Sequence, residues 1–409
     1  MKNILLKPMM TLAFTVAMIL TGAANMQAQS INMSRYITLT VESGKEIRLN
    51  LLAASTDTPI RIVSGSNTQD ITVGIDWTGS QTYTTDGNTM TLYGDIIGFI
   101  CSNNNSKITD VDVSRNTQLT ILACSNNEIS NLDISQHTQL IKLYCSKNRL
   151  TTLDISNNTQ LEELYCANNQ LTNLDVSNNT VLTGLFCYNN RFTTLDISKN
   201  TALIKLYCHN NQITALDLNQ NTQLKELFCQ NNKLSALDVS RNVQLLQLCC
   251  YNLNLSTAGI DSLYCYLPDH AGKSIVGYIY PVYSASSPNH ATVMASTKGN
   301  ATTKNWKVQY FSNYKDIPAT SGSFVCPNTN TETIYAPVAV SLYPNPVKDL
   351  LHTEADGEVR SIRVYNIYGT EVVSATGTNQ IDLSSLPAGV YAVRVVTDKG
   401  ISVQRVVKR

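Results

Sequence analysis

Apolar and polar positions recur with a long, fixed period through the middle of the chain. Between residues 96 and 255 a unit of 21 residues repeats, with apolar side chains at its places 1, 4, 11, 14 and 16 and asparagine at its place 9. Units that begin at Leu140 and Leu161 show the pattern most clearly. A period of this length is typical of a solenoid, in which each unit adds one strand to a parallel sheet and buries its apolar face against its neighbours. The pattern therefore predicts a solenoid over residues 96–255.

Place 6 of every unit holds a cysteine. Successive cysteines are 21 residues apart after a first step of 23 residues, and the row reads Cys101, Cys124, Cys145, Cys166, Cys187, Cys208, Cys229 and Cys250. Strand side chains alternate, so places 4 and 6 point into the solenoid and place 5 points out. Parallel neighbours point the same way, which suits neither a disulfide nor a tetrahedral metal site. We therefore expect reduced thiols in the core. A disulfide among Cys249, Cys265 and Cys326, outside this row, stays open.

The motif LxxLxCxxNxL resembles the strand-and-turn signature of leucine-rich repeats, with cysteine in place of a leucine. The chain resembles the internalin-like leucine-rich repeat proteins of bacteria, although its unit carries cysteine and no LPxTG motif is present. The resemblance implies adhesion, in which the concave face of a curved, capped solenoid meets a host receptor, another bacterium or a matrix component. It does not carry over the identity of the receptor.

The segments on either side of the repeats predict caps for the solenoid. Residues 29–95 alternate apolar and polar positions, as at Ile37, Leu39 and Val41, and predict an N-terminal β cap. Residues 256–311 lose the period and are interpreted as a degenerate C-terminal cap. Within that cap we expect a short helix and two strands, at 258–267, 276–280 and 306–310.

The last quarter of the chain predicts a linker and a separate β domain. Residues 312–338 are rich in Ser, Thr, Asn and Pro and are interpreted as a linker. Short strands separated by turn signals over residues 339–409 predict an Ig-like β-sandwich. The predicted fold class is thus mainly β: a leucine-rich repeat solenoid with a parallel sheet, an N-terminal β cap and a C-terminal sandwich.

The C-terminal domain resembles the type A C-terminal sorting domain of the type IX secretion system. The matching positions form three motifs, and their defining residues are Tyr343, Pro344, Asn345 and Pro346, then Gly369, then Gly389 and Tyr391. The resemblance implies recognition by the type IX secretion machinery, transport across the outer membrane, removal of the domain, and attachment to the cell surface or release.

The N-terminus predicts export through the inner membrane. Lys2 and Lys7 precede the apolar run Met9–Leu20, which is short for a membrane span, and small residues follow. We interpret residues 1–28 as a signal peptide and expect no integral membrane span in the mature chain. The expected location is the outer-membrane surface or the extracellular space, reached through the periplasm.

Charge and motifs exclude several functions. Lys+Arg and Asp+Glu both count 30, so the net charge is zero and nothing favours nucleic acid as a partner. The sequence has no HExxH, P-loop, GxSxG or kinase motif, and the five histidines form no recognisable triad or metal spacing. We therefore expect no enzyme activity, no cofactor and no metal.

Two polar places of the unit have structural interpretations. The place-9 asparagines are expected to bind backbone groups of adjacent turns. Place 15 gives a row of carboxylates whose repulsion is relieved either by hydrogen bonds to the backbone or to the place-17 side chain, or by calcium between coils. The row consists of Asp112, Asp133, Asp154, Asp175, Asp196, Asp217 and Asp238.

The outward place 5 holds the candidate binding residues. Aromatic side chains there are Tyr144, Tyr165, Phe186, Tyr207 and Phe228, with Tyr188, His209 and Tyr251 beside them at place 7. Aromatic residues are enriched at binding hot spots, although such neighbours could also only stack and stiffen the sheet. The predicted function is a surface adhesin that binds a host or bacterial protein or glycan. The alternative is a self-associating component of the cell surface or biofilm matrix.

Overall fold

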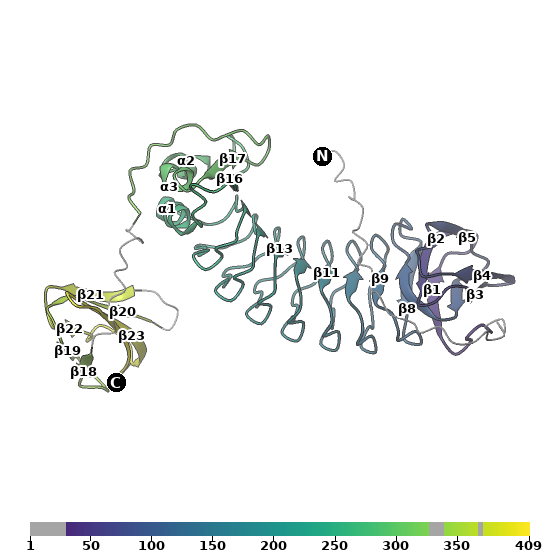
Figure 1. The fold of residues 1–409 in the computed structure, drawn as a ribbon, viewed down its shortest axis with the longest axis horizontal. Coiled ribbons are helices and arrows are strands. Elements are labelled where there is room, and N and C mark those ends of the chain that lie inside the picture. Colours follow the sequence, from purple (N-terminus) through teal and green to yellow (C-terminus); the bar gives the residue numbers. More distant parts are fainter. Residues whose placement is uncertain (1–29, 327–338, 367–370) are drawn as a thin grey trace, which may run out of the picture. The chain divides into compact units, whose positions relative to one another are not determined.

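The computed structural model describes residues 30–326, 339–366 and 371–409 (Figure 1). The predicted signal peptide and Gly369 lie outside the described residues. The described residues form two compact units, one that ends at Ser323 and one that begins at Phe324. Within the described residues no helix is both long and apolar enough to cross a bilayer.

The N-terminal cap is built from two sheets. One is five-stranded, in the order β4-β3-β6-β1-β8, and β5 and β2 of the other continue into the solenoid sheet. Alternate residues such as Ile37, Leu39, Leu49 and Leu51 fill one core between the sheets. The strands of the cap are β1 (Tyr36–Val41), β2 (Glu46–Ala53), β3 (Thr58–Ser64), β4 (Asn67–Val73), β5 (Gln81–Thr84), β6 (Thr89–Tyr93) and β8 (Ile108–Asp112). The strand β7 (Ile96–Ile100) is the first strand of the solenoid and pairs in parallel with the strand of the next coil.

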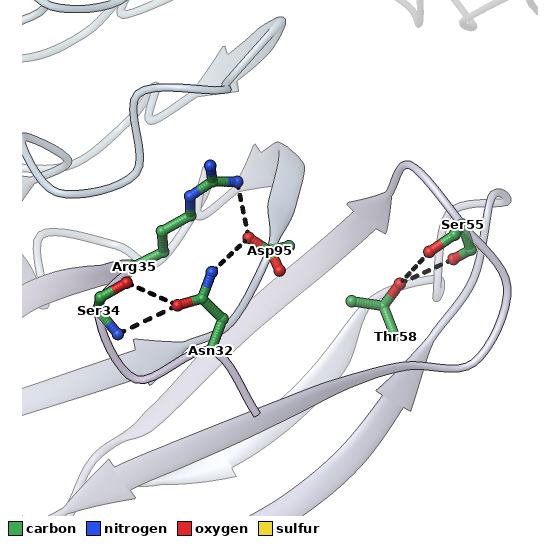
Figure 2. Close-up of polar contacts among 6 residues, drawn as sticks. All are labelled: Asn32, Ser34, Arg35, Ser55, Thr58 and Asp95. Carbon is green, nitrogen blue, oxygen red and sulfur yellow. Dashed lines mark hydrogen bonds and ion pairs between the residues drawn. The ribbon is translucent and has the colours of Figure 1, made fainter. Parts of the chain in front are cut away.

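Polar contacts close the start of this cap. Asp95 accepts hydrogen bonds from the Nδ2 of Asn32 at 3.0 Å and from Nη1 of Arg35 at 2.7 Å (Figure 2). In the turn that precedes residues 58–64, the Thr58 hydroxyl donates to the Ser55 carbonyl at 2.9 Å. The first residues of the cap are thereby fixed beside the residue that precedes the first solenoid strand.

The solenoid contributes one short parallel strand from each coil. Neighbouring strands pair in register, so that Leu143, Leu164 and Leu185 lie side by side. Figure 1 shows these strands along the inner side of the curved array of coils. The strands are β9 (Ile121–Ala123), β10 (Lys142–Tyr144), β11 (Glu163–Tyr165), β12 (Gly184–Phe186), β13 (Lys205–Tyr207), β14 (Glu226–Phe228) and β15 (Gln247–Cys249).

The C-terminal cap extends the same parallel sheet. Its strands β16 (Gly277–Val282) and β17 (Trp306–Tyr310) follow β15, and its helices are α1 (Thr257–Tyr266), α2 (His290–Met294) and α3 (Gly299–Thr302). The predicted helix and both predicted strands are confirmed within two residues at each end, whereas α2 and α3 were not predicted. Residues 315–317, at the start of the predicted linker, fold back along β17 through Tyr310 N–H to Lys315 O and Ile317 N–H to Val308 O.

One continuous hydrophobic core joins the two caps and the solenoid. It runs from Ile37 to Ile317 and includes the leucines and cysteines of every coil. Because no coil can bury its apolar places alone, each depends on its neighbours for stability. The inward residues are thereby held in place, which fixes the direction of the outward residues between them.

The second unit is a small β-sandwich. One sheet has the order β18-β19-β22 and the other β21-β20-β23-β24. Leu351 and Ile381 of the first sheet share a core with Ile362 and Val393 of the second. The strands are β18 (Val340–Tyr343), β19 (Leu350–Ala355), β20 (Val359–Tyr365), β21 (Glu371–Thr376), β22 (Gln380–Asp382), β23 (Gly389–Thr397) and β24 (Ile401–Lys408).

Candidate binding face

The outward side of the parallel sheet carries a continuous row of aromatic rings, which we call the aromatic ladder: Tyr144, Tyr165, Phe186, Tyr207 and Phe228. Successive ring centroids are 4.7, 4.0, 4.9 and 4.4 Å apart. No ring of the ladder belongs to the main core. The prediction that place 5 points outward is therefore confirmed. The rings nevertheless cover one another, and Phe186 is only 9% exposed.

Ion pairs and hydrogen bonds hold two tyrosines of the ladder. Glu163 accepts a hydrogen bond from the Tyr144 hydroxyl at 3.0 Å and pairs with Nζ of Lys142 at 3.0 Å. Three coils further on, Tyr207, Glu226 and Lys205 repeat the arrangement. Burial and the nearby carboxylate raise the pKa of both Tyr144 and Tyr207, so both hydroxyls stay protonated at neutral pH. The two clusters neutralise their own charges and fix the rings beside them.

Gly184 interrupts this pattern between the two clusters. It stands at place 3, where Glu163 and Lys205 stand in the adjoining coils. A Cβ atom at Gly184 would lie 3.0 Å from Cε2 of Phe186, so the glycine leaves room for that ring against the backbone. Phe186 lies parallel to Tyr165, at 8°, and crosses Tyr207 at 64°. The stacking direction therefore changes at this coil.

Place 7 adds a second, shorter stack. The rings of Tyr188 and His209 are 4.4 Å apart and 7° from parallel. Burial lowers the pKa of His209 to about 4, because the charged imidazolium would lose solvation. His209 is consequently neutral at physiological pH and acts as a flat aromatic side chain. Tyr251, the third predicted residue at this place, is 8% exposed and packs in a separate cluster with Cys249 and Tyr280.

Sequence reasoning missed the aromatic residues beyond Tyr251. We call Tyr280, Tyr283, Phe311 and Tyr314 the C-terminal aromatic cluster. Tyr280 and Phe311 meet at 5.6 Å and 83°, and Tyr251 and Tyr283 at 5.4 Å and 63°. These residues lie in the cap, where the 21-residue period is lost, so no repeat signal could connect them to the ladder. The register of β15 with β16 does so, because it places Cys249 beside Tyr280.

The cysteine row forms the predicted spine inside the solenoid. All eight of its cysteines are free and buried. Burial raises the pKa of each thiol, to about 12 at Cys124, Cys166 and Cys208, which leaves the thiols protonated and unreactive. Outside the row Cys249 is free, whereas Cys265 and Cys326 are disulfide-bonded.

Two asparagine rows support the turns. Asn190, at place 9, donates to the carbonyls of Cys166 and Cys187 at 3.0 and 3.1 Å and accepts from Leu171 N–H at 3.0 Å, as predicted for this place. A second row at place 19 was not singled out from the sequence. There the Asn200 amide donates to the carbonyls of Val176 and Asn179, both at 2.9 Å. Both rows satisfy backbone groups that would otherwise be buried without partners.

The aspartate row at place 15 faces solvent and binds its own backbone. Asp175 Oδ1, for example, accepts from the N–H of Ser177 at 2.9 Å, and this bond lowers the pKa of the carboxyl. The same contact recurs from Asp112 to Asp238. Among the described residues no group of three or more His, Cys, Asp or Glu side chains is placed to hold a metal ion. The hydrogen bonds account for this row without a cation.

The motif residues of the C-terminal unit fasten its last strand. The Asn345 side chain donates to the Arg405 carbonyl at 3.0 Å and accepts from Val407 N–H at 2.9 Å. The peptide bonds before Pro344 and Pro346 are cis, and Tyr343 stacks on His352 at 5.7 Å. Gly389 opens β23, and the buried Tyr391 donates its hydroxyl to the Pro387 carbonyl at 2.8 Å. The two Asn345 contacts hold β24 against the sandwich, and the other two fix β18 beside β19 and the start of β23.

Two family models match the chain. The model described as a secretion system C-terminal sorting domain matches residues 341–409, and the model described as leucine-rich repeats in two copies matches residues 138–179. This protein is a secreted surface protein built on leucine-rich repeats. Its sorting domain is of the type IX kind and directs the leucine-rich repeat protein to the cell surface or the extracellular space.

Several solved structures match parts of the chain. The functional domain of InlJ from Listeria monocytogenes, which includes a cysteine ladder, is 21% identical over 80% of this chain and 94% of that one, with a TM-score of 0.36. A leucine-rich repeat protein of Leptospira interrogans is 22% identical over 37% of this chain and 48% of that one, with a TM-score of 0.33. The leucine-rich repeat domain of APL1B is 18% identical over 53% and 63%, with a TM-score of 0.40. No curated protein matches the sequence.

Proposed function

We propose that this leucine-rich repeat protein is an adhesin that binds a partner on a host or bacterial surface through the concave face of its solenoid. One observation carries the proposal: an aromatic row, from Tyr144 to Phe228, stands outside the main core and is held in fixed positions by stacking and by two Lys–Glu–Tyr clusters. Rigid aromatic side chains lose little entropy on binding and are enriched where binding energy concentrates. The contact strip would consist of the ladder with Tyr188, His209 and Tyr251 beside it.

Repetition supports the same proposal. A solenoid stacks identical coils into an extended concave surface, and such surfaces are typical of interaction proteins rather than of enzymes. The residues that would make an enzyme site are separated here. His209 lies beside the ladder in the second stack, and His137 is buried on the return side of the coils, the part that leads from one strand back to the next. Export by the sorting domain would place this surface where other cells are met.

The test compares two triple variants of the chain, each expressed with its signal peptide and sorting domain and collected after export. In the first, Tyr144→Ser, Tyr165→Ser and Tyr207→Ser remove three ladder rings. In the matched control, Thr152→Ala, Asn173→Ala and Thr194→Ala remove exposed side chains at place 13, on the return side. The labelled proteins are applied to intact mammalian epithelial cells and to intact bacterial cells, and circular dichroism confirms folding.

We expect the ladder variant to lose binding and the return-side control to bind as the wild type does. Equal binding by both variants would refute the concave face as the contact surface. Binding of the chain only to itself, seen as concentration-dependent oligomers in sedimentation, would favour a self-associating component of the cell surface or biofilm matrix instead.

A further inference from the structure

The C-terminal aromatic cluster differs from the ladder in how its rings meet. Tyr280 and Tyr314 cross at 79°, and Phe311 and Tyr314 at 65°, so edges rather than faces are in contact. The outer rings remain open to solvent, since Tyr283 is 45% and Tyr314 60% exposed. Large exposed aromatic side chains that lie together are uncommon on a surface that binds nothing. The exposure of these rings therefore needs an explanation other than packing within this chain, whereas the ladder is explained by its stacking.

Tyr314 is held in an unfavourable backbone conformation. Its φ angle is 59°, in the left-handed region that asparagine and glycine adopt more readily than tyrosine. The turn around it is closed by Tyr314 N–H to Tyr310 O and by Tyr310 N–H to Lys315 O, both at 3.0 Å, and by Lys315 N–H to Asn313 Oδ1. A tyrosine kept at such a position, with its ring exposed, is a feature that often accompanies function.

One unpaired positive charge lies on β17 opposite Tyr278, two residues before Tyr280 of the cluster. Lys307 points outward from β17, and its Nζ is 5.8 Å from the centroid of the Tyr278 ring. The other lysines of this outward column, Lys142 and Lys205, are bound to Glu163 and Glu226. Lys307 forms no ion pair with any residue in the described ranges 30–326, 339–366 and 371–409. A carboxylate of a binding partner would form an ion pair with Lys307.

We propose that the C-terminal aromatic cluster is the anchor by which the concave face holds a protein partner. An apolar or aromatic side chain of the partner packs among Tyr283, Phe311 and Tyr314, and a neighbouring carboxylate of the partner pairs with Lys307. This inference rests on the proposed function and adds to it the place of the strongest contact and the class of the partner.

The available polar groups favour a protein over a glycan. A sugar is recognised by many directional hydrogen bonds, yet the hydroxyls of Tyr144 and Tyr207 are already bound to carboxylates of this chain. The cluster offers four aromatic rings and the hydroxyls of three tyrosines, and Lys307 adds a single cation, so apolar ring surface outweighs the directional polar groups that a sugar requires. Rings of this kind around a small desolvated centre, with a charge at the rim, are typical of protein–protein hot spots.

The experiment uses the chain as it is exported and the cells to which the wild type binds. Tyr314→Asn removes the ring and keeps a residue suited to the left-handed turn, and Lys307→Glu reverses the charge. Two controls match them: Tyr266→Asn on α1, where Tyr266 is 41% exposed and lies away from the sheet, and Lys307→Arg. We expect each test variant to bind roughly tenfold more weakly or worse, with melting temperatures no lower than that of the wild type, and both controls to bind normally.

Further outcomes separate this inference from the proposed function. If the ladder triple variant loses binding while Tyr314→Asn and Lys307→Glu bind as the wild type does, the cluster is not the anchor. The proposal that the concave face is the contact surface would then remain. If the wild type binds no cell surface, both fail. Protease treatment of the target cells should abolish binding and periodate oxidation should not. The reverse result would show a glycan partner and overturn the inference.

Discussion

The ladder and the C-terminal aromatic cluster place the same residue types on the same sheet and use them differently. In the ladder Tyr165 and Phe186 lie face to face at 4.0 Å, and tyrosine hydroxyls are bound by internal carboxylates. In the cluster Tyr280 meets Phe311 at 83° and Tyr314 at 79°, whereas Tyr283 is tilted at 42° to Phe311. The side chains of Tyr283 and Tyr314 are open to solvent. Aromatic rings on a sheet can thus either pack against each other or remain exposed and free to contact a partner. The ring faces distinguish the two cases, whereas residue type does not.

The largest expected effect concerns stability. Tyr165→Ser removes two stacking contacts and the apolar area they cover, so the free energy of unfolding should fall by about 2–4 kcal/mol. Tyr314→Asn removes an exposed ring and relieves a left-handed tyrosine, so stability should be unchanged or slightly higher. Thermal melting of the two variants measures the difference. Equal losses in both would mean that the cluster, too, serves mainly to hold the fold.

A smaller effect is expected from a single hydroxyl. Tyr207→Phe deletes the 2.6 Å hydrogen bond to Glu226 but keeps the ring and leaves Glu226 paired with Lys205. Hydrogen bonds to charged groups contribute about 1.5–3 kcal/mol, and partial exposure here lowers that to roughly 1 kcal/mol. The matched change Tyr283→Phe should cost nothing in stability. Urea unfolding of both proteins would contradict this account if their midpoints moved together.

The smallest effect is a pH dependence within the ladder region. The unfolded His209 binds a proton below a pKa of about 6.5, whereas the folded one stays neutral down to about pH 4. The unfolded state thus binds more protons in this window, and stability falls as the pH drops from 6.5 to 4. After screening, the loss from His209 should be on the order of 1 kcal/mol. His209→Phe, which keeps the stack on Tyr188, should reduce the loss.

A second histidine, His137, should contribute to the same pH dependence. It stands where other coils have the place-19 asparagine, and burial lowers its pKa as well. His137→Asn should restore bonds to the carbonyls of Val113 and Asn116, as Asn158 makes to Ile134 and His137, and raise stability by about 1 kcal/mol. The double variant combines His209→Phe with His137→Asn. If its stability fell as much between pH 6.5 and 4 as that of the wild type, these two histidines would not be the source of the pH dependence.

The period in the sequence determined what could be predicted. Residues that share a place in the 21-residue unit become neighbours 4.8 Å or so apart, which is why the thiol spine, the place-9 asparagines and the outward ladder were all predictable. Place 19 was equally visible in the repeat and was overlooked as a hydrogen-bonding row. The burial of Phe186 and Tyr251 could not be predicted from the repeat, because it depends on contacts outside the repeat pattern. Gly184 leaves room for the ring of Phe186, and Tyr251 packs in a cluster with Tyr280.

The cap lies beyond the reach of that reasoning. Tyr283 and Tyr314 are far apart in sequence, have no repeat partner and come together only because β16 and β17 continue the sheet and residues 311–312 pair with 282–283. Alternation can suggest that a strand is present, but it does not say which loop residues stand at its end. The part of the face that we propose as the anchor is thus the part with the weakest sequence signal.

Oxidative footprinting of the tyrosines in the free and cell-bound exported chain tests the contrast most directly. In the free protein Tyr314 and Tyr283 should be oxidised fastest and Tyr165 and Tyr280 slowly, and on binding Tyr314 and Tyr283 should become protected. Ladder tyrosines that were oxidised as fast as Tyr314, or a Tyr314 that stayed reactive in the bound state, would contradict the division between a self-satisfied ladder and an open anchor.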